Sequence, residues 1–269
     1  MAGSTATPTP VNNRSVYGVR VHRPRSIDEV RELRERLPDS QYLAGGTWIM
    51  RAPLRAESLP EDVILLTGVA GLDRITITDS VEIGAMATLA DLVSALPKSP
   101  DLRALHEAAA KAATPALRNM ITVGGSIGAE SFWASDIVPA LLCLDAQIIR
   151  DGDLILGVHI ARSDRVSCHA RLTWRTGGEY SVASVSMSRA TERDGADLRI
   201  ALGSVEARPR RWTELENAAS QGPFTPDHLA SLARELVEEL DAVSAPGIPA
   251  AYRRTVLPQV VAQATARLM

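Results

Sequence analysis

The 269-residue sequence predicts an α+β protein in two parts, an α/β domain followed by a sheet-and-helix domain. Helical stripes and short β-rich runs interleave as far as Ser163, whereas strands come first and helices last beyond it. We therefore expect domains at 15–163 and 164–269. Residues 1–14 are small and polar, and they predict a disordered tail.

The first 50 residues predict a βαβ unit that ends in a glycine turn. After a strand at 17–21, the hydroxyl of Ser26 can cap a helix while Glu29 reaches back to a free amide. The expected helix has an apolar stripe at helical spacing, formed by Ile27, Val30, Leu33 and Leu37. A second strand at 41–44 runs directly into Gly45-Gly46-Thr47, and loops at the carboxyl end of such strands commonly bind ligands.

The middle of the chain alternates between strand and helix signals. Apolar runs separated by turn residues predict strands at 63–67, 73–77 and 81–85, with a hairpin turn at 78–80. Thr88 can cap a helix over 89–96, and Asp101 can cap another over 102–113. After Thr114-Pro115 ends that helix, the segment 121–123 leads into a second glycine turn, Gly124-Gly125-Ser126.

The last 120 residues predict strands followed by helices. Strands are expected at 154–160, 172–174, 181–188 and 198–205, because apolar and small polar residues alternate there. Thr225-Pro226 predicts a helix start, with a buried stripe that ends at Leu240, and the final helix covers 252–268.

Composition excludes several classes of function. The net charge of −3 gives no basis for binding nucleic acid or an anionic membrane. The longest apolar run, 137–146, is shorter than the roughly 20 residues of a membrane helix and contains Asp145. We therefore predict no nucleic-acid partner and no membrane span.

The two cysteines carry no metal or disulfide pattern. Cys143 and Cys168 have no CxxC spacing, and an iron–sulfur cluster usually takes about four thiolates, so this chain cannot bind one alone. Cys168 and His169 are neighbours in an expected strand, so their side chains should point to opposite faces and not form a nucleophile pair. The absence of an export signal predicts a reducing, cytoplasmic setting.

The two glycine turns share their surroundings. Each follows a strand-like segment and precedes a hydroxyl residue, Thr47 or Ser126. Glycine leaves amides bare, so consecutive N–H groups can converge on an anion, and two such turns could hold a pyrophosphate. Alternatively, each is only a tight turn. The sequence has neither GxGxxG opening a helix after the first strand nor GxxxxGK[ST], so a dinucleotide would not be bound in the Rossmann manner.

Four further segments are informative when taken together: YLAGGT at 42–47, LRNMITVGGSI at 117–127, SDIVPALL at 135–142 and AYRR at 251–254. In this order they resemble the flavin subunit of the molybdenum hydroxylases, a family that includes the medium subunit of carbon monoxide dehydrogenase and the FAD portion of xanthine dehydrogenase. The resemblance implies a vanillyl-alcohol-oxidase-type FAD-binding domain, with a small βαβ subdomain and an α/β subdomain, followed by a C-terminal antiparallel sheet with helices.

The resemblance also implies FAD as cofactor and assigns the residues that bind it. These are Leu43, Ala44, Gly45, Gly46, Thr47, Trp48, Thr122, Gly124, Gly125, Ser126, Asp136 and Arg175. Asp136 can also be a helix N-cap, and the two roles are compatible. Arg118-Asn119 can either brace the backbone or contact the ligand.

The chain departs from the family pattern at four places. Ser126 replaces an asparagine. Trp48 replaces an aspartate and can either lie against adenine or ribose or be a core tryptophan. Arg175 is the nearest equivalent of a lysine beside the flavin, and can instead be a solvated surface residue. The family insert between Ala146 and Leu154 is mostly missing.

The implied function is electron transfer, with no acid or base catalyst in this chain. The implied partners are a small subunit with [2Fe–2S] clusters and a large molybdopterin subunit, in a dimer of heterotrimers. Electrons would pass from the clusters through FAD to NAD, oxygen or another acceptor. Two alternatives stay open: a stand-alone flavin reductase, and an assembly subunit that has lost FAD.

Overall fold

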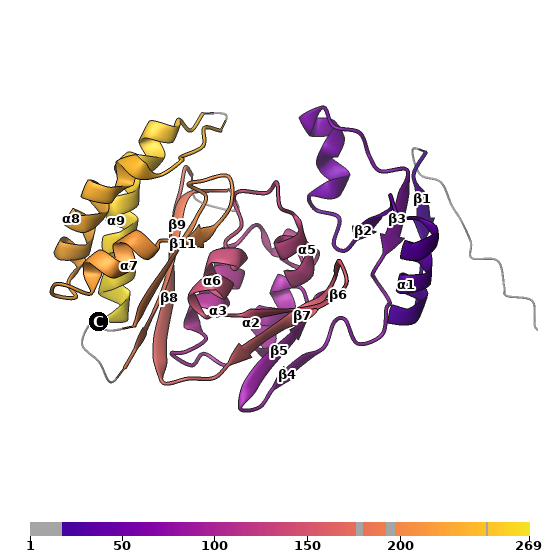
Figure 1. Cartoon of the computed structure of the whole chain (residues 1–269), viewed down its shortest axis with the longest axis horizontal. Coiled ribbons are helices and arrows are strands. Elements are labelled where there is room, and N and C mark those ends of the chain that lie inside the picture. Colours follow the sequence, from indigo (N-terminus) through magenta and orange to yellow (C-terminus); the bar gives the residue numbers. More distant parts are fainter. Residues whose placement is uncertain (1–17, 176–179, 192–196, 246) are drawn as a thin grey trace, which may run out of the picture.

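The computed structural model describes residues 18–175, 180–191, 197–245 and 247–269. It has three sheets, with helices on both sides of the C-terminal one (Figure 1). The tail expected at 1–14 lies outside the described residues, as does Tyr17 of the first expected strand.

The N-terminal sheet has three parallel strands in the order β1-β3-β2. Its elements, with the helix that packs on it, are β1 (Arg20–His22), α1 (Ile27–Arg36), β2 (Gln41–Leu43) and β3 (Asp62–Leu65). The predicted cap is confirmed, because the Ser26 hydroxyl accepts a hydrogen bond from the Glu29 amide at 3.2 Å, and the Glu29 carboxylate accepts one from the Arg25 amide at 2.7 Å. The predicted βαβ unit is therefore present, with β3 inserted between its two strands.

The second sheet is antiparallel, in the order β4-β5-β7-β6. Its strands are β4 (Ile75–Ile77), β5 (Ser80–Gly84), β6 (Gln147–Asp151) and β7 (Leu154–Ala161). The helices of this part are α2 (Leu89–Ala95), α3 (Arg103–Lys111), α4 (Pro115–Arg118), α5 (Val123–Gly128) and α6 (Ile137–Cys143). The sheet and helices share one core around Ile83, Leu92 and Leu105, each no more than 1% exposed.

The predicted cap of α3 by Asp101 is wrong. The N-cap position is Leu102, which offers no side-chain acceptor, and the Asp101 carboxylate binds the Arg162 guanidinium. The guanidinium donates through two nitrogens to this carboxylate, and such two-point arginine–carboxylate pairs are among the strong charge-assisted hydrogen bonds. The hydroxyl of Ser167, from a strand of the C-terminal sheet, accepts from the Ala104 amide at 3.0 Å and satisfies the helix start.

The C-terminal sheet is antiparallel, in the order β11-β10-β9-β8, and is covered on both faces. Its strands are β8 (Arg165–Thr173), β9 (Ser181–Ala190), β10 (Leu198–Gly203) and β11 (Arg210–Arg211). The helices that follow, shown in orange and yellow in Figure 1, are α7 (Thr213–Ala219), α8 (Pro226–Leu236), η2 (Val237–Glu239) and α9 (Ala250–Leu268). On the other face, α3 and α6 contact β8, β9 and β10.

Neighbouring side chains in β8 point to opposite faces of the sheet, as strand geometry requires, and both faces are buried. The Cys168 sulfur lies 3.2 Å from the Ala264 carbonyl oxygen of α9, whereas the His169 ring contacts Asp136 before α6. The prediction that Cys168 and His169 do not pair is confirmed. Burial raises the pKa of the Cys168 thiol to about 12, which leaves it protonated at neutral pH.

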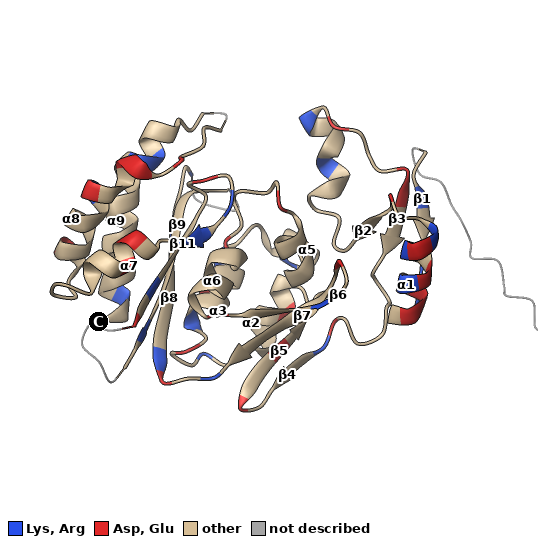
Figure 2. Cartoon of the chain, in the orientation of Figure 1, with Lys and Arg blue, Asp and Glu red and all other residues tan. Residues whose placement is uncertain are grey.

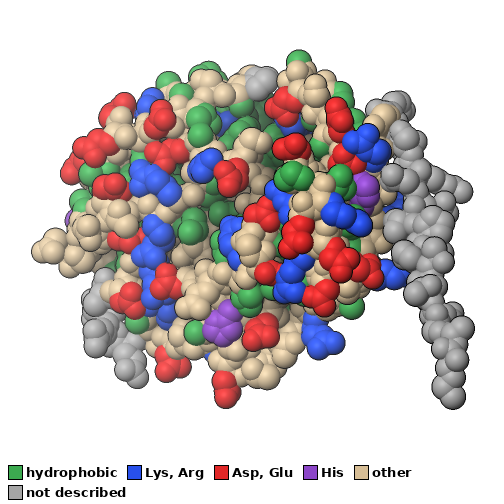
Figure 3. All heavy atoms as spheres, turned by 45° about the vertical axis from the view of Figure 1, so that its right-hand side comes forward, with side chains coloured by type: hydrophobic (Ala, Val, Ile, Leu, Met, Phe, Trp, Pro, Cys, Tyr) green, Lys and Arg blue, Asp and Glu red, His purple; other side chains and the backbone are tan. Residues whose placement is uncertain are grey.

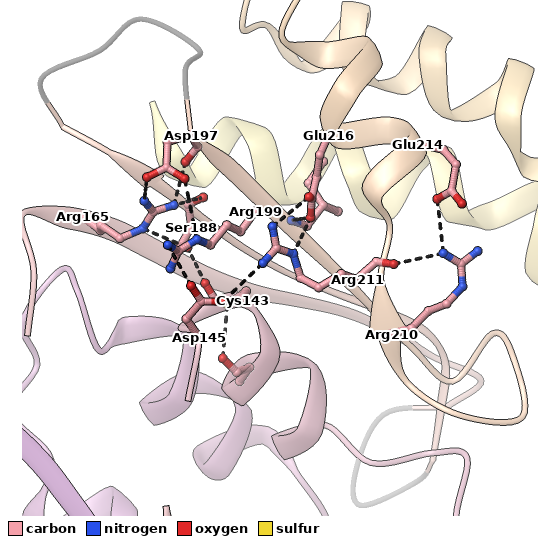
Figure 4. A network of polar contacts seen from close by, with 12 residues as sticks. Cys143, Asp145, Arg165, Ser188, Asp197, Arg199, Arg210, Arg211, Glu214 and Glu216 are labelled. Carbon is pink, nitrogen blue, oxygen red and sulfur yellow. Dashed lines mark hydrogen bonds and ion pairs between the residues drawn. The ribbon is translucent and has the colours of Figure 1, made fainter. Parts of the chain in front are cut away.

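A polar network ties the end of α6 to the C-terminal sheet (Figure 4). Asp145 pairs with Arg199 at 2.9 Å and with Arg211 at 3.5 Å, and the Ser188 hydroxyl donates to the Cys143 carbonyl oxygen at 2.5 Å. The expected boundary at Ser163 falls between β7 and β8, which belong to different sheets. The domain limits themselves stay a prediction.

Charged side chains of both signs are mixed over the surface. Acidic and basic residues alternate along α1 (Figure 2), and the face shown in Figure 3 has no large area of one sign. No helix among the described residues has the length and apolar character needed to span a bilayer.

Candidate functional site: a cleft between two glycine segments

A cleft of about 1210 Å³ brings the two glycine segments together. Pockets for drug-sized ligands are usually about 300–1,000 Å³, so this cleft has room for a dinucleotide. Ten of the twelve predicted site residues line it: Ala44, Gly45, Gly46, Thr47, Trp48, Thr122, Gly124, Gly125, Ser126 and Asp136. Leu43 and Arg175 are not part of the lining.

The first glycine turn leaves β2 with its amides free. Gly46 has a φ of +70°, which a residue with a Cβ adopts only with strain. Gly45 lies against the chain entering α5, because a Cβ at Gly45 would be 1.7 Å from the Met120 carbonyl oxygen. Within the described residues, the amides from Gly45 to Trp48 have no hydrogen-bond acceptor, and neither does the Thr47 hydroxyl as a donor. Free donors that face a cleft suit an anion.

The second glycine segment is not a turn of free amides, so that prediction is wrong. Thr122 caps α5, and Gly124 and Gly125 belong to its first turn without a positive φ. The Gly124 amide donates to the Ala85 carbonyl at 2.8 Å, and the Gly125 amide donates to the Thr122 hydroxyl at 3.1 Å. The Ser126 hydroxyl likewise donates to the Thr122 carbonyl, at 2.8 Å. This segment uses its polar groups internally.

The glycines of α5 serve close packing instead. A Cβ on Gly124 would lie 2.6 Å from the Cβ of Ala85, and one on Gly125 would lie 2.7 Å from the Thr122 Oγ1 and 3.5 Å from the Cβ of Ala44. Because Gly124 has no side chain, α5 sits close to the segment after β5, whereas its contact with Ala44 of the first turn is an ordinary one. The two glycine segments thus meet, as predicted. The first contributes free amides, whereas the second contributes a closely packed helix whose amides are bonded internally.

Trp48 is part of the cleft wall, so its interpretation as a core residue is wrong. The Arg55 guanidinium lies 3.9 Å from the centre of the indole, and the Phe132 ring centre is 4.8 Å away. The indole N–H donates to the Ser131 hydroxyl at 3.0 Å. A contact between the indole and adenine or ribose stays a prediction.

Asp136 is a buried anion at the cleft, held by the C-terminal sheet. It occupies the N-cap position of α6 without a cap hydrogen bond. Its carboxylate accepts from Ser181 at 2.9 Å, from the His169 ring at 3.3 Å and from Arg171 at 2.8 Å. Burial alone would raise the pKa of Asp136, but these donors outweigh burial, and the pKa lies below its ordinary value.

Two further predicted positions lie away from the cleft. Arg175 is an exposed residue after β8 and Leu43 belongs to β2. Arg118 donates to the carbonyls of Ala112 and Ala113 at 3.2 and 3.0 Å. Arg118 therefore braces the backbone.

Sequence reasoning missed a set of cleft residues in and after the 3-10 helix η1 (Ile49–Arg55) and beyond α5. They are Arg51, Arg55, Ser131, Phe132 and Tyr180. The available signal was compositional: Phe132 is one of two phenylalanines in the chain, and it precedes Trp133 directly after the second glycine segment. Ligand pockets are commonly lined by aromatic side chains, so Phe132 and Trp133 beside a glycine segment were the available indication of a cleft wall.

Comparison with known proteins gives the family. The model of the FAD binding domain in molybdopterin dehydrogenase matches residues 16–153, and that of the CO dehydrogenase flavoprotein C-terminal domain matches residues 170–268. The nicotine 6-hydroxylase medium subunit of Paenarthrobacter nicotinovorans is 24% identical, over 90% of this chain and 94% of that protein. The glyceraldehyde dehydrogenase medium chain of Sulfolobus acidocaldarius is 24% identical, over 87% and 92%.

Solved structures share the fold. Carbon monoxide dehydrogenase from Hydrogenophaga pseudoflava superimposes with a TM-score of 0.79 at 22% identity, covering 92% of this chain and 96% of that chain. Quinoline 2-oxidoreductase from Pseudomonas putida gives a TM-score of 0.76 at 19% identity, covering 92% and 95%. The predicted fold class and the predicted cofactor are confirmed. The chain belongs to the family of FAD-binding domains of molybdopterin dehydrogenases, and it is an FAD-binding oxidoreductase subunit of the molybdenum hydroxylase type.

Proposed function

We propose that this chain transfers electrons within a multi-subunit molybdenum hydroxylase. A small partner subunit with [2Fe–2S] clusters delivers electrons to FAD in this chain, and a large molybdopterin subunit oxidises the substrate. NAD, oxygen or another acceptor takes the electrons from FAD. The observation that carries the proposal is the run of free amides from Gly45 to Trp48 in a cleft of about 1210 Å³.

The residues of the cleft fit a dinucleotide. The free amides and the Thr47 hydroxyl would hold the pyrophosphate, while α5 packs against the segment after β5 and contacts the first turn at Ala44. A carboxylate has about four acceptor positions, so Asp136 keeps one for a ligand hydroxyl beyond its three donors. We retain Leu43 and Arg175 as proposed cofactor contacts on the resemblance alone.

Flavin chemistry supplies the redox step: bound FAD can take electrons one at a time and pass on two. The protein binds and orients the cofactor and sets its electrostatic environment. No side chain of the cleft is required to move a proton.

The partners are proposed from relatives that this chain matches over at least 85% of their length. Those relatives are called medium subunits or FAD subunits of dehydrogenases and hydroxylases. We propose the same three-subunit organisation here, as a dimer of heterotrimers, in the cytoplasm.

Purification of the chain with the products of its neighbouring genes tests the proposal. We expect a complex with a flavin absorbance spectrum that releases FAD on denaturation and also contains iron, sulfide and molybdopterin. A yellow chain that is active alone would instead indicate a stand-alone flavin reductase. A colourless complex would indicate an assembly subunit without FAD.

A further inference from the structure

Three aromatic side chains meet at the cleft, and each comes from a different part of the fold. Trp48 follows the N-terminal sheet, Phe132 follows α5, and Tyr180 precedes β9 of the C-terminal sheet. The ring centres of Trp48 and Phe132 are 4.8 Å apart, and those of Phe132 and Tyr180 are 5.3 Å apart. All three line the cleft. We call Trp48, Phe132 and Tyr180 the aromatic bridge.

Polar contacts fix both ends of the aromatic bridge. The Arg51 guanidinium donates to the Tyr180 hydroxyl at 2.6 Å, and the Trp48 N–H donates to the Ser131 hydroxyl at 3.0 Å. Arg55 stacks on the indole while it binds Glu57 at 2.6 Å and the Trp48 carbonyl at 3.1 Å. Edge and stacking contacts between aromatic rings add to simple burial, and a guanidinium over an indole adds further attraction.

The position of the aromatic bridge relates it to the proposed pyrophosphate site. Trp48 is itself the last residue of the free-amide run, and Ser131 and Phe132 follow α5 by three and four residues. The contacts of Trp48 therefore join the free-amide turn to the segment directly after α5, the helix that contains the second glycine segment. A side chain that fixes Trp48 also fixes the direction of the adjacent amides.

We propose that Trp48 is a positioning residue whose bridge to Ser131 and Phe132 holds the free amides in place for a diphosphate and slows release of the dinucleotide. This rests on the proposed function, because the diphosphate is that of the FAD site. The bridge acts on binding and release, so its effect is separate from electron transfer.

The first test measures release of FAD from the purified complex, followed by the rise in fluorescence of free flavin. We expect Trp48→Ala to release FAD at least about tenfold faster than wild type, since it removes the stacking contacts and one hydrogen bond. Trp48→Phe keeps a ring beside Phe132 and Arg55 but loses the N–H, and it should restore most of the slow release. Ser131→Ala should match Trp48→Phe, and the double variant should add little more.

Two variants control for general damage. Trp174 is also a surface-accessible tryptophan, 52% exposed and packed on Tyr252 outside the cleft lining. Leu54 is on η1, 78% exposed and also outside the lining. Trp174→Ala and Leu54→Ala should release FAD at the wild-type rate. Should Trp48→Ala fail to fold, Trp48→Phe and Ser131→Ala carry the test.

The second test uses the nucleotide-free chain and two probes, ADP and AMP. AMP has the same adenine and ribose but no diphosphate, so Trp48→Ala should weaken ADP binding by about tenfold and leave AMP binding unchanged. If Trp48→Ala releases FAD and binds ADP as the wild type does, the proposed role of the aromatic bridge is wrong. That result would leave the proposal of FAD binding in place. A wild-type chain that binds neither FAD nor ADP would overturn the proposed function itself.

Discussion

Gly45-Gly46-Thr47 and Gly124-Gly125-Ser126 look alike in sequence and line the same cleft, but the structure uses them in opposite ways. At the first turn the amides are free and Gly46 has a positive φ. At the second, the Ala85 carbonyl and a helix cap accept the amides, and the missing side chain of Gly124 permits packing against Ala85. A glycine pair therefore indicates either exposed donors or close contact, and only the hydrogen-bond partners distinguish the two.

Gly45→Ala should have the largest effect, and it should act on FAD binding. The new Cβ would lie 1.7 Å from the Met120 carbonyl oxygen, so the turn must move away from α5. We expect FAD affinity to fall by about 100-fold or more, which corresponds to about 2.8 kcal/mol. Equilibrium titration with FAD, alongside thermal unfolding, measures both effects.

Gly128→Ala is the matched control for Gly45→Ala. Gly128 also lines the cleft, but a Cβ there would meet only the Ile155 side chain at 3.7 Å, an ordinary contact. Helical Gly→Ala changes stability by about 1 kcal/mol or less, and FAD affinity should stay at the wild-type value. Equal loss of affinity in both variants would contradict a specific role for the first turn.

Asp136→Asn should come next, and it should act on stability. The substitution leaves Arg171 and the His169 ring without their anion, and removing one partner of a buried pair costs about 3–5 kcal/mol. Urea unfolding at neutral pH measures the loss. A change below about 1 kcal/mol would show that the C-terminal sheet does not depend on this carboxylate.

The same carboxylate predicts an acid-sensitive component of stability. The pKa of Asp136 is lower in the folded state than in the unfolded state, where it is about 3.9. Its contribution is therefore fully present above that value and is lost as pH falls toward the folded-state pKa. Unfolding free energies measured below about pH 4 should converge for wild type and Asp136→Asn.

Gly124→Ala should destabilise the fold by about 1–3 kcal/mol, because its Cβ would lie 2.6 Å from the Cβ of Ala85. FAD affinity, measured where the variant is folded, should change less than at Gly45. Adding Ala85→Gly removes the contact partner and should recover part of the stability. If affinity falls about 100-fold while stability is unchanged, the second segment would be a ligand site like the first.

Substitutions of the two hydroxyl residues, Thr47 and Ser126, should have the smallest effects. Together they distinguish best between the roles of the two glycine segments. The Thr47 hydroxyl donates to no acceptor in the described part of the chain, so Thr47→Val should weaken FAD binding about fivefold with unchanged stability. The Ser126 hydroxyl donates to the Thr122 carbonyl, so Ser126→Ala should cost about 1 kcal/mol of stability with unchanged affinity. The reverse pattern would exchange the roles of the two segments.

Local signals predicted most of the fold. The caps at Ser26, Thr88 and Thr225 each depend on a side chain and an amide three residues apart, and all three are present. The stripe of α1 likewise buries Val30 and Leu33. Local hydrogen bonds and helical spacing need no knowledge of the rest of the chain, which is why the sequence was sufficient there.

Tertiary contacts account for the errors. α5 contains three glycines in six residues, and it forms because Thr122 caps it and the segment after β5 accepts its first amides. The start of α3 is satisfied by Ser167, more than 60 residues away in the chain, which leaves Asp101 to Arg162. Trp48 and Ser131 are 83 residues apart, so no local pattern could have paired them. The glycine segments were sufficient to locate the site in the sequence. They did not identify the aromatic and arginine side chains that form the wall of the cleft.

A structure of the chain with FAD bound is the most direct test of the central claim. We predict pyrophosphate oxygens within about 3.2 Å of amide nitrogens between Gly45 and Trp48. The amides of Gly124 and Gly125 should keep their bonds to Ala85 and Thr122. A pyrophosphate bound to the α5 amides, with those internal bonds broken and the first turn free, would contradict the account.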